Sequence, residues 1–319
     1  MSGLSSPVPG PDAPGAGHGQ RALGRWLVFL ATVFWGTTAT LARSVFRDDG
    51  VPAQTVVELR LAIAAGALFV WLVFRRRSAL RLEPRDRLQI LVLGLFGVAA
   101  VQGSYYYSIS RLGVGLAILL QYVAPSLIVL WEMARGTRPS AATVAAVVLA
   151  LGGTALLVRG VDTISVHAST FDWIVGASCA FIFAFYVLAS KRVVARYAPE
   201  TVLLYTFAIA AAFWACVTPP WRIVAAHYPA RVWLRFVLLG IFSTLVPFRC
   251  FYAGLKRLPA AEAGIIATAE PVVAILAAFV FLGEGLTPGQ IVGAVLVVGA
   301  AVLAARGNPE TAQAAAERG

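Results

Sequence analysis

Long apolar segments separated by short polar ones make up most of the chain. A helix needs about 20 mostly apolar residues to cross a bilayer. Ten segments meet this length within a few residues, at 26–46, 53–74, 88–109, 113–133, 140–158, 172–190, 200–218, 233–254, 260–282 and 288–305. The longest links between them lie at 75–87 and 219–232. The pattern predicts an all-α integral membrane protein with ten transmembrane helices.

The second half of the chain repeats the first. Residues 55–125 align without a gap on residues 201–271, with 18 of 71 positions identical. Arg111 and Pro125 match Arg257 and Pro271 in this register. Each half then holds five spans, and an odd number places the second half upside down in the membrane. We therefore expect two inverted five-helix repeats. Inverted repeats are typical of alternating-access transporters.

The expected organisation follows from these boundaries. The first repeat covers 24–160 and the second covers 171–306. Residues 1–23, rich in Pro, Gly and Ser, and residues 307–319 are expected to form disordered cytoplasmic tails. The first tail has no early positive charge and does not resemble a signal peptide.

Composition supports a membrane protein and argues against other classes. The chain is 59% hydrophobic and 13% charged, with a mean hydropathy of +0.80, whereas soluble domains are about 45–50% apolar and about 25% charged. The net charge of +11 falls mostly between spans, and no nucleic-acid motif accompanies it, so we expect no nucleic-acid partner. The three cysteines and three histidines form no metal-ligand or catalytic pattern. We therefore expect no metal, cofactor or catalytic residues, and no P-loop is present.

The distribution of basic residues predicts the orientation. If the N-terminus is cytoplasmic, the cytoplasmic segments hold 17 Lys and Arg and the external ones hold 7. Cytoplasmic loops carry an excess of Lys and Arg. Both termini are therefore expected in the cytoplasm, in a multi-pass protein of the plasma (inner) membrane, although the 219–232 loop is basic and is placed outside.

A small set of polar and aromatic residues lies within the spans. A charged side chain at the centre of a lone helix costs about 2.5–3.5 kcal/mol, so such residues are expected to face a cavity or a partner. The residues that we expect to bind substrate or to act as gates are Arg60, Gln102, Tyr106, Gln121, Tyr122, Arg249, Tyr252 and Glu270. Of the adjacent tyrosines at 105–107, at most two can face inward, because they spread over about 200° of helix.

Arg60 and Arg249 each allow two interpretations. Arg60 lies about 12 Å from the nearer end of its span at 1.5 Å per residue. It could hold a carboxylate, or it could pair with Glu58 or a backbone carbonyl; Glu58 is two residues away and so lies on nearly the opposite helix face. Arg249 follows Pro247, which can bend the helix, and it could face the cavity or extend to the headgroups.

Glu270 lies near the middle of its span and is followed by Pro271. The proline removes a backbone donor and frees the carbonyl of Ala267, and Pro125 does the same for Gln121 in the first half. Interrupted helices at matching positions of two repeats indicate a binding site. Burial favours the protonated form of a carboxyl group, so Glu270 could carry a coupling proton, contact substrate, or instead act structurally by pairing with Arg249 or a helix end.

Several motifs resemble those of the EamA family of the drug/metabolite transporter superfamily. They are FWGTTATLARS (34–44), YSISRLGVGLAILLQYVAP (107–125), FYAGLKRLP (251–259) and AEPVVAILAAFVFLGEGLTPGQIVGAVLVVGA (269–300). The resemblance covers about residues 24–306 and implies a ten-helix bundle with a central cavity. The first half departs from the pattern, because Pro125 is followed by a proline after 14 residues and Pro271 after 17, so the two gates need not be symmetric.

The resemblance implies a secondary transporter, an exporter of amino acids or related small polar metabolites. The alternatives are an exchanger of phosphorylated or nucleotide-linked sugars, which would need more basic residues facing the cavity, and a membrane-embedded enzyme or receptor, for which the sequence shows no converging catalytic groups and no soluble domain. The expected partners are a small-molecule metabolite, the lipid bilayer and a proton as a coupling ion. The oligomeric state is left open.

Overall fold

The computed structural model describes residues 14–159, 168–282 and 285–306, and within these ranges it contains helices and no strand. The α-helices are α1 (Pro14–Arg47), α2 (Ala53–Arg75), α3 (Arg87–Val92), α4 (Ala100–Leu112), α5 (Val114–Gln121), α6 (Ala124–Ala134), α7 (Ala141–Val158), α8 (Thr170–Val194), α9 (Pro199–Val217), α10 (Pro220–Ala225), α11 (Ala230–Leu238), α12 (Val246–Arg257), α13 (Ala260–Ala267), α14 (Glu270–Leu282) and α15 (Pro288–Arg306). Two 3-10 helices, η1 (Arg77–Leu80) and η2 (Pro84–Asp86), and two π-helices, η3 (Leu93–Ala99) and η4 (Leu239–Leu245), complete the set.

Nine helical stretches of the described chain are long and apolar enough to cross a membrane. They coincide with the second to tenth predicted spans, so the membrane-protein class is confirmed, while the count of ten stays a prediction. The first predicted span lies within α1, which has 34 residues but is not among the nine. Its apolar run is interrupted by the sequence GTTAT at 36–40. The helix also begins at Pro14, inside the segment 1–23 that was predicted to be disordered, whereas residues 1–13 and 307–319 lie outside the described residues.

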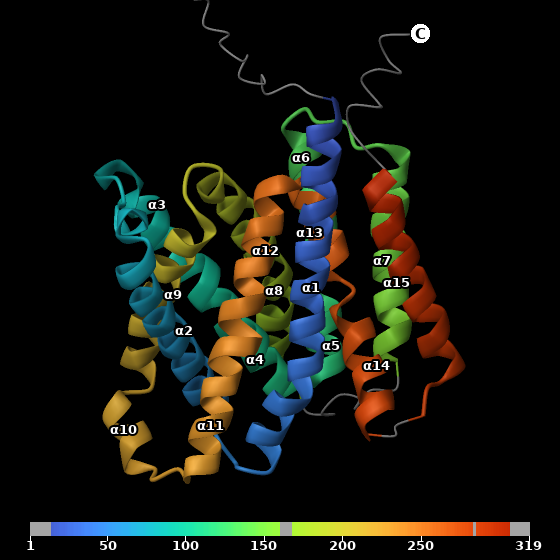
Figure 1. Cartoon of the computed structure of the whole chain (residues 1–319). Helices are drawn as coiled ribbons and strands as arrows, with labels where there is room; N and C mark the ends of the chain where they lie inside the picture. Colours follow the sequence, from blue (N-terminus) through green and yellow to red (C-terminus); the bar gives the residue numbers. More distant parts are fainter. Residues whose placement is uncertain (1–13, 160–167, 283–284, 307–319) are drawn as a thin grey trace, which may run out of the picture.

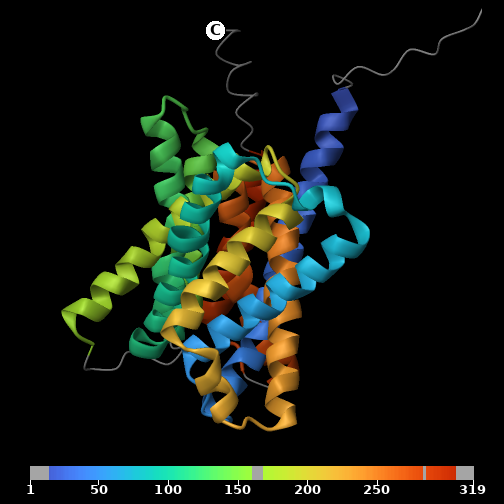
Figure 2. The same cartoon turned by 90° about the vertical axis from the view of Figure 1, so that its left-hand side faces the viewer.

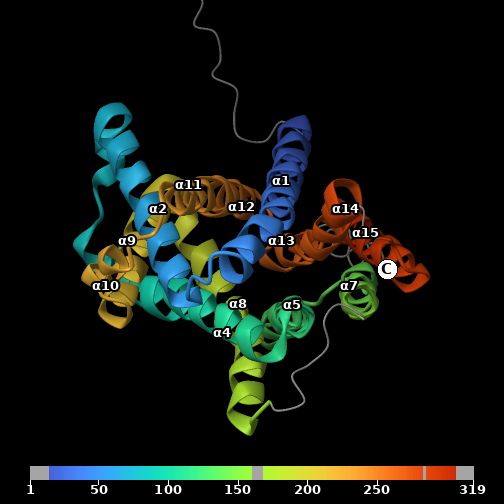
Figure 3. The ribbon, with the colours of Figure 1, turned by 90° about the horizontal axis from the view of Figure 1, so that it is seen from below.

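The helices form one bundle with two distinct ends. Helix α1 begins and helix α15 ends at the same end, which we call the upper end because it is drawn uppermost in Figure 1. The segment between α2 and α3 also lies there, and α10 lies at the opposite, lower end. Seen along the bundle from below, α7, α14 and α15 lie to one side and α2, α9 and α10 to the other, with α1 and α12 between them (Figure 3).

The secondary structure of the two halves repeats at the offset found in the sequence. The π-helices η3 and η4 each have seven residues and start 146 positions apart. Helices α5 and α13 start 146 positions apart, as do α6 and α14. In both halves the helix break is followed by a proline in the first turn of the next helix, which is the place predicted from Pro125 and Pro271. The duplication therefore extends to local backbone geometry.

Glycines in the two π-helices allow the halves to pack closely and reciprocally. An ideal Cβ on Gly94 would lie 2.7 Å from Cγ2 of Ile209, and one on Gly240 would lie 2.6 Å from Cγ2 of Ile63. Carbon atoms in contact prefer about 3.5–4.0 Å, so a larger residue does not fit at either place without movement. Since Ile63 and Ile209 are also 146 positions apart, each half inserts the same isoleucine against the same glycine of the other.

Candidate functional site

A cavity of about 390 Å³ lies in the middle of the bundle. Its lining comes from both halves of the chain, mainly from α1, α2, α4, α5, α8, η4, α12 and α14. The residues that line it are Trp35, Ala42, Phe46, Arg60, Val101, Gln102, Tyr105, Tyr106, Ile109, Gly113, Ile118, Gln121, Tyr122, Phe183, Ser243, Phe248, Glu270 and Ala274. Ala42 and Phe46 near the end of α1 and Gly113 after α4 are among them, so the cavity extends from the middle toward the lower end. Its volume is at the lower end of the range for small-molecule sites, about 300–1,000 Å³.

Arg60 is the cation of this cavity. Its side chain is buried, with 4% of the residue exposed. The Nε–H donates to Oγ1 of Thr244 at 2.8 Å, and a terminal N–H donates to the carbonyl oxygen of Ser243 at 3.0 Å. The other terminal nitrogen donates to the hydroxyl of Tyr106, over whose ring the guanidinium also lies at 5.4 Å. Glu58 is not among these partners, as expected from its position on the other face of α2.

The binding capacity of Arg60 is only partly used. A guanidinium group carries five N–H donors, and three of them serve Thr244, Ser243 and Tyr106. The remaining two N–H groups of Arg60 therefore form no hydrogen bond with any described residue. The Tyr106 hydroxyl accepts from Arg60 and can still donate its own proton. Together these groups can hold one carboxylate.

Glu270 is the carboxylate of the cavity. It is the first residue of α14, directly after the break that follows α13. Its Oε2 accepts a hydrogen bond of 2.7 Å from the hydroxyl of Tyr122, which lies at the matching break after α5. The two broken helices thus meet through this hydrogen bond. Pairing of Glu270 with Arg249, one of the structural alternatives raised by the sequence, is not what the structure shows.

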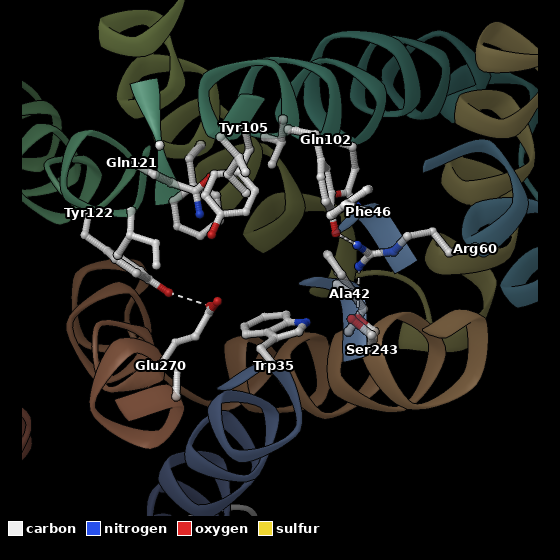
Figure 4. A pocket seen from close by; sticks show the side chains of 18 residues that line it. Trp35, Ala42, Phe46, Arg60, Gln102, Tyr105, Gln121, Tyr122, Ser243 and Glu270 are labelled. Atoms are coloured by element: carbon white, nitrogen blue, oxygen red, sulfur yellow. Dashed lines mark hydrogen bonds between the residues drawn. The ribbon is translucent and has the colours of Figure 1, made fainter. Parts of the chain in front are cut away.

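The two charges face each other across the cavity. Figure 4 shows Arg60 on one side and Glu270 on the other, with the indole of Trp35 at the wall between them. Tyr122 and Gln121 lie on the Glu270 side, and Phe46 and Ser243 lie on the Arg60 side (Figure 4). Most of the remaining wall is apolar or aromatic. The site therefore combines one basic and one acidic group in a largely apolar space.

Both predicted glutamines, and two of the three adjacent tyrosines at 105–107, line the cavity. Gln102 and Gln121 line the cavity and are buried, and the Gln102 Nε2 has no hydrogen-bond partner among the described residues. Tyr105 and Tyr106 line the cavity as well. Tyr107 instead donates to Oδ1 of Asp172 at 2.7 Å. The expectation that at most two of the three tyrosines face inward is confirmed.

Arg249 and Tyr252 do not line the cavity. Arg249 forms an ion pair with Glu200 at 2.7 Å, its side chain is 53% exposed, and it lies 5.9 Å from the ring of Trp71. Tyr252 is fully buried and its hydroxyl is 2.9 Å from that of Ser190. Pro247, predicted to bend the eighth span, lies in the first turn of α12 directly after η4, so a change of helix type occurs at this place.

A cluster of aromatic side chains bounds the cavity on its upper side. Phe183 and Phe248 line the cavity and pack against Tyr186, with ring centroids at 5.8 and 6.4 Å. Tyr186 in turn packs against Tyr252 at 6.0 Å, and Phe207 packs against Phe248 at 5.5 Å. We call the residues Phe183, Tyr186, Phe207, Phe248 and Tyr252 the aromatic cluster. Tyr186 and Tyr252 follow Phe183 and Phe248 along α8 and α12 and do not line the cavity themselves.

Ser243 and Thr244 are site residues that the sequence prediction missed. Both lie in the π-helix η4 and provide oxygen atoms that fix Arg60. Short π-helices are frequent at functional sites. The signal available in the sequence was the pair of hydroxyl residues inside the apolar segment 233–254. Among the described residues, no group of three or more His, Cys, Asp or Glu is arranged to bind a metal ion.

Comparisons with curated proteins give transporters as relatives. The chain is 25% identical over 303 residues to an uncharacterized inner membrane transporter, YicL, of Salmonella typhimurium, covering 93% of this chain and all of that one. It is 29% identical over 288 residues to the threonine/homoserine exporter RhtA of Escherichia coli K12, covering 89% and 90%. It is 28% identical over 284 residues to a probable terminal-alkyne amino-acid exporter of Streptantibioticus cattleyicolor, covering 87% and 92%.

The fold and the family are also found independently of these relatives. A solved crystal structure has the same fold with a TM-score of 0.73 and 25% identity, covering 89% of this chain and 96% of that one. The family model of the EamA-like transporters matches twice, at residues 22–159 and 173–306. The two matches correspond to the two repeats recognised in the sequence. The chain is a multi-pass membrane protein of two repeats, and it belongs to the EamA-like transporter family.

Proposed function

We propose that this protein is a secondary transporter that exports amino acids or closely related small polar metabolites. The observation that carries the proposal is the placement of Arg60 and Glu270 on opposite sides of one cavity. A zwitterion needs such an arrangement. Its carboxylate would be held by the two remaining N–H groups of Arg60 and by the Tyr106 hydroxyl. Its ammonium group would contact Glu270, whose Oε2 is fixed by Tyr122.

The names of the relatives support this substrate class. RhtA is named as an exporter of threonine and homoserine, and another relative is named as an amino-acid exporter. A sugar phosphate would be expected to require several cations. Arg60 is the basic residue among those that line the described cavity, and Arg249 lies elsewhere with its own acidic partner. The lining therefore favours a zwitterion over a dianion.

The mechanism we propose is alternating access between two inverted repeats of five spans, with α1 as the first span and both termini in the cytoplasm. In this arrangement the cavity extends toward the external side, and the aromatic cluster closes the cytoplasmic side. Gln102 and Gln121 would contact the substrate, whereas Arg249 and Tyr252 would act in gating. The breaks before Pro125 and Pro271 would allow Tyr122 and Glu270 to move with the substrate. Coupling to a proton is a further part of this proposal.

The direct test is transport by the purified protein in liposomes. Counterflow of labelled threonine, homoserine and larger apolar amino acids is measured beside that of a hexose phosphate. For Arg60→Gln we expect the apparent affinity for the amino acid to fall about 10- to 100-fold, because a hydrogen bond to a charged group contributes about 1.5–3 kcal/mol. In Arg60→Lys the apparent affinity should fall less. The variant keeps the positive charge, although a point charge replaces the planar fork of donors.

Arg192→Gln is the matched comparison, because it removes the same charge from the exposed end of a span, outside the lining of the cavity. We expect its apparent affinity to stay within twofold of the parent value. Unchanged amino-acid affinity in folded Arg60→Gln would remove Arg60 from the site. Counterflow of the hexose phosphate without counterflow of any amino acid would overturn the proposed substrate class.

A further inference from the structure

A second hollow lies at the upper end of the bundle, away from the central cavity. It is a groove of about 1,040 Å³ between the segment that links α2 to α3 and the helices α3 and α9. This linking segment, residues 76–86, contains η1 and η2 and lies at the same end as the start of α1 (Figure 1 and Figure 2). The groove therefore lies at the level of the membrane surface, where spans end.

The wall of the groove is held in place by side chains of the second repeat. Thr201 donates to the carbonyl oxygen of Ala79 at 2.7 Å, and Tyr205 donates to that of Leu80 at 2.5 Å. The Tyr197 hydroxyl donates to Oδ2 of Asp86 at 2.6 Å. Two hydroxyl groups of α9 thus hold the backbone of the linking segment, and the Tyr197 hydroxyl, just before α9, holds the side chain of Asp86. These hydrogen bonds define the wall of the groove.

The groove has an apolar floor and an excess of positive charge. Leu80, Leu82 and Ile90 line it together with Ile209. Both acidic residues of the linking segment already have basic partners: Glu83 pairs with Arg85 at 2.7 Å and Asp86 pairs with Arg196 at 2.8 Å. Arg81 and Arg87 also line the groove, are exposed, and form no ion pair with any described residue. Two positive charges, those of Arg81 and Arg87, therefore remain beside the apolar floor of the groove.

We propose that this groove binds an anionic phospholipid. The phosphate of the headgroup would lie between Arg81 and Arg87, and an acyl chain would follow the floor formed by Leu80, Leu82 and Ile90. Leu91, which also lines the groove, is 43% exposed, and Leu88 on the same helix is 69% exposed, so the apolar surface continues toward the bilayer. Basic pockets beside transmembrane helices at the cytoplasmic side are typical sites for anionic headgroups. The proposal is independent of the transported substrate.

The test compares two double variants that remove the same charge. In Arg81→Gln/Arg87→Gln both arginines of the groove are lost. In Arg75→Gln/Arg76→Gln two exposed arginines at the same end, outside the lining of the groove, are lost. The full-length protein in detergent is titrated with phosphatidylglycerol or phosphatidylcholine, and bound lipid is measured by native mass spectrometry. Elution as a single species in size-exclusion chromatography establishes that each variant is folded.

We expect the parent protein to bind phosphatidylglycerol in preference to phosphatidylcholine. The groove variant should lose about 10- to 30-fold in affinity for phosphatidylglycerol, the effect of two basic side chains at an anionic surface. The comparison variant should lose less than threefold. Equal binding of the two lipids, or equal losses in the two variants, would overturn the proposal. Displacement of the lipid by millimolar inorganic phosphate alone would also overturn it, because the groove would then bind a soluble anion.

Discussion

Arg60 shows why some site residues can be predicted from an apolar sequence and others cannot. A charge inside a span is costly unless it has partners, so Arg60 and Glu270 are conspicuous in the sequence, and both line the cavity. Ser243 and Thr244 fix Arg60 but were missed, because a hydroxyl in a helix costs little and gives no comparable signal. Arg249 was equally conspicuous, yet its partner Glu200 is 49 residues away. Such a pairing depends on tertiary structure and cannot be read from local sequence.

The Tyr106 hydroxyl is expected to affect substrate binding separately from stability. In Tyr106→Phe one buried N–H of Arg60 loses its acceptor, which costs about 1–3 kcal/mol, and the proposed carboxylate loses a donor. We expect a lower melting temperature. We also expect the apparent affinity to fall about 5- to 10-fold, because one hydrogen bond to the substrate is lost. Melting is followed in detergent, and affinity is followed by counterflow.

Tyr107→Phe is the matched control for this prediction. It removes a neighbouring hydroxyl that donates to Asp172, outside the cavity. We expect some loss of stability and no change in apparent affinity. Equal changes of affinity in the two variants would show that the effect of Tyr106 is structural.

Glu270→Gln distinguishes two roles of this carboxylate. If Glu270 contacts the substrate ammonium, the neutral variant should lose both counterflow and gradient-driven accumulation while it stays folded. If Glu270 carries a coupling proton, accumulation should be lost and counterflow kept, since exchange moves no net proton. Both activities are measured in the same liposomes, with melting temperature as the check on folding. Full activity in both assays would exclude Glu270 from binding and from coupling.

Among the secondary-structure elements, the helix breaks were predictable and the π-helices were not. Pro125 and Pro271 remove a backbone donor, and the structure ends α5 at Gln121 and α13 at Ala267, the residues whose carbonyl groups were expected to lose their partner. A π-helix needs one extra residue in a turn, and neither LGLFGVA nor LGIFSTL contains a residue that demands it. Each π-helix contains a glycine, Gly94 or Gly240, that lies in close contact with an isoleucine of the other half, and such contacts cannot be read from the local sequence.

Alanine at either glycine of the π-helices is therefore expected to be destabilising. The added methyl group would lie 2.6–2.8 Å from Ile63 or Ile209, and overpacking of this kind costs about 1–3 kcal/mol. Gly94→Ala and Gly240→Ala should both lower the melting temperature in detergent. Replacing the facing isoleucine as well, in Gly94→Ala/Ile209→Ala, should restore part of the loss.

Gly66→Ala is the control for these substitutions. Gly66 lies within α2, and no atom lies within 4 Å of an ideal Cβ at this position. In a helix interior alanine is more favourable than glycine by about 0.5–1 kcal/mol, so we expect an unchanged or slightly higher melting temperature. Unchanged stability of Gly94→Ala and Gly240→Ala would show that the close contact between the halves is easily relieved.

For the whole molecule, the two repeats are tied together by charges at both ends of the bundle. At the lower end, Asp49 after α1 pairs with Arg235 of α11 and lies 3.7 Å from Arg231. At the upper end, Arg196 after α8 pairs with Asp86 before α3. In each case the first helix of one repeat is joined to the third span of the other, with the signs of the charges exchanged. The duplication could be predicted from the sequence, but these pairs could not, because the charged positions differ between the halves.

The orientation of the bundle can be tested without knowledge of the substrate. The start of α1, the end of α15 and the segment between α2 and α3 lie at one end (Figure 1). The segments expected at that end carry 17 basic residues, against 7 at the other, so this end should be cytoplasmic. Reporter fusions after Arg77 and after Arg306 should both read cytoplasmic, and a fusion near Asp49 should read external. A fusion at Pro219 should also read external, because α9 ends and α11 begins at the lower end. We expect this result although the segment that follows Pro219 is basic. A cytoplasmic reading near Asp49 would mean that α1 does not cross the membrane, and two inverted repeats of five spans would then be excluded.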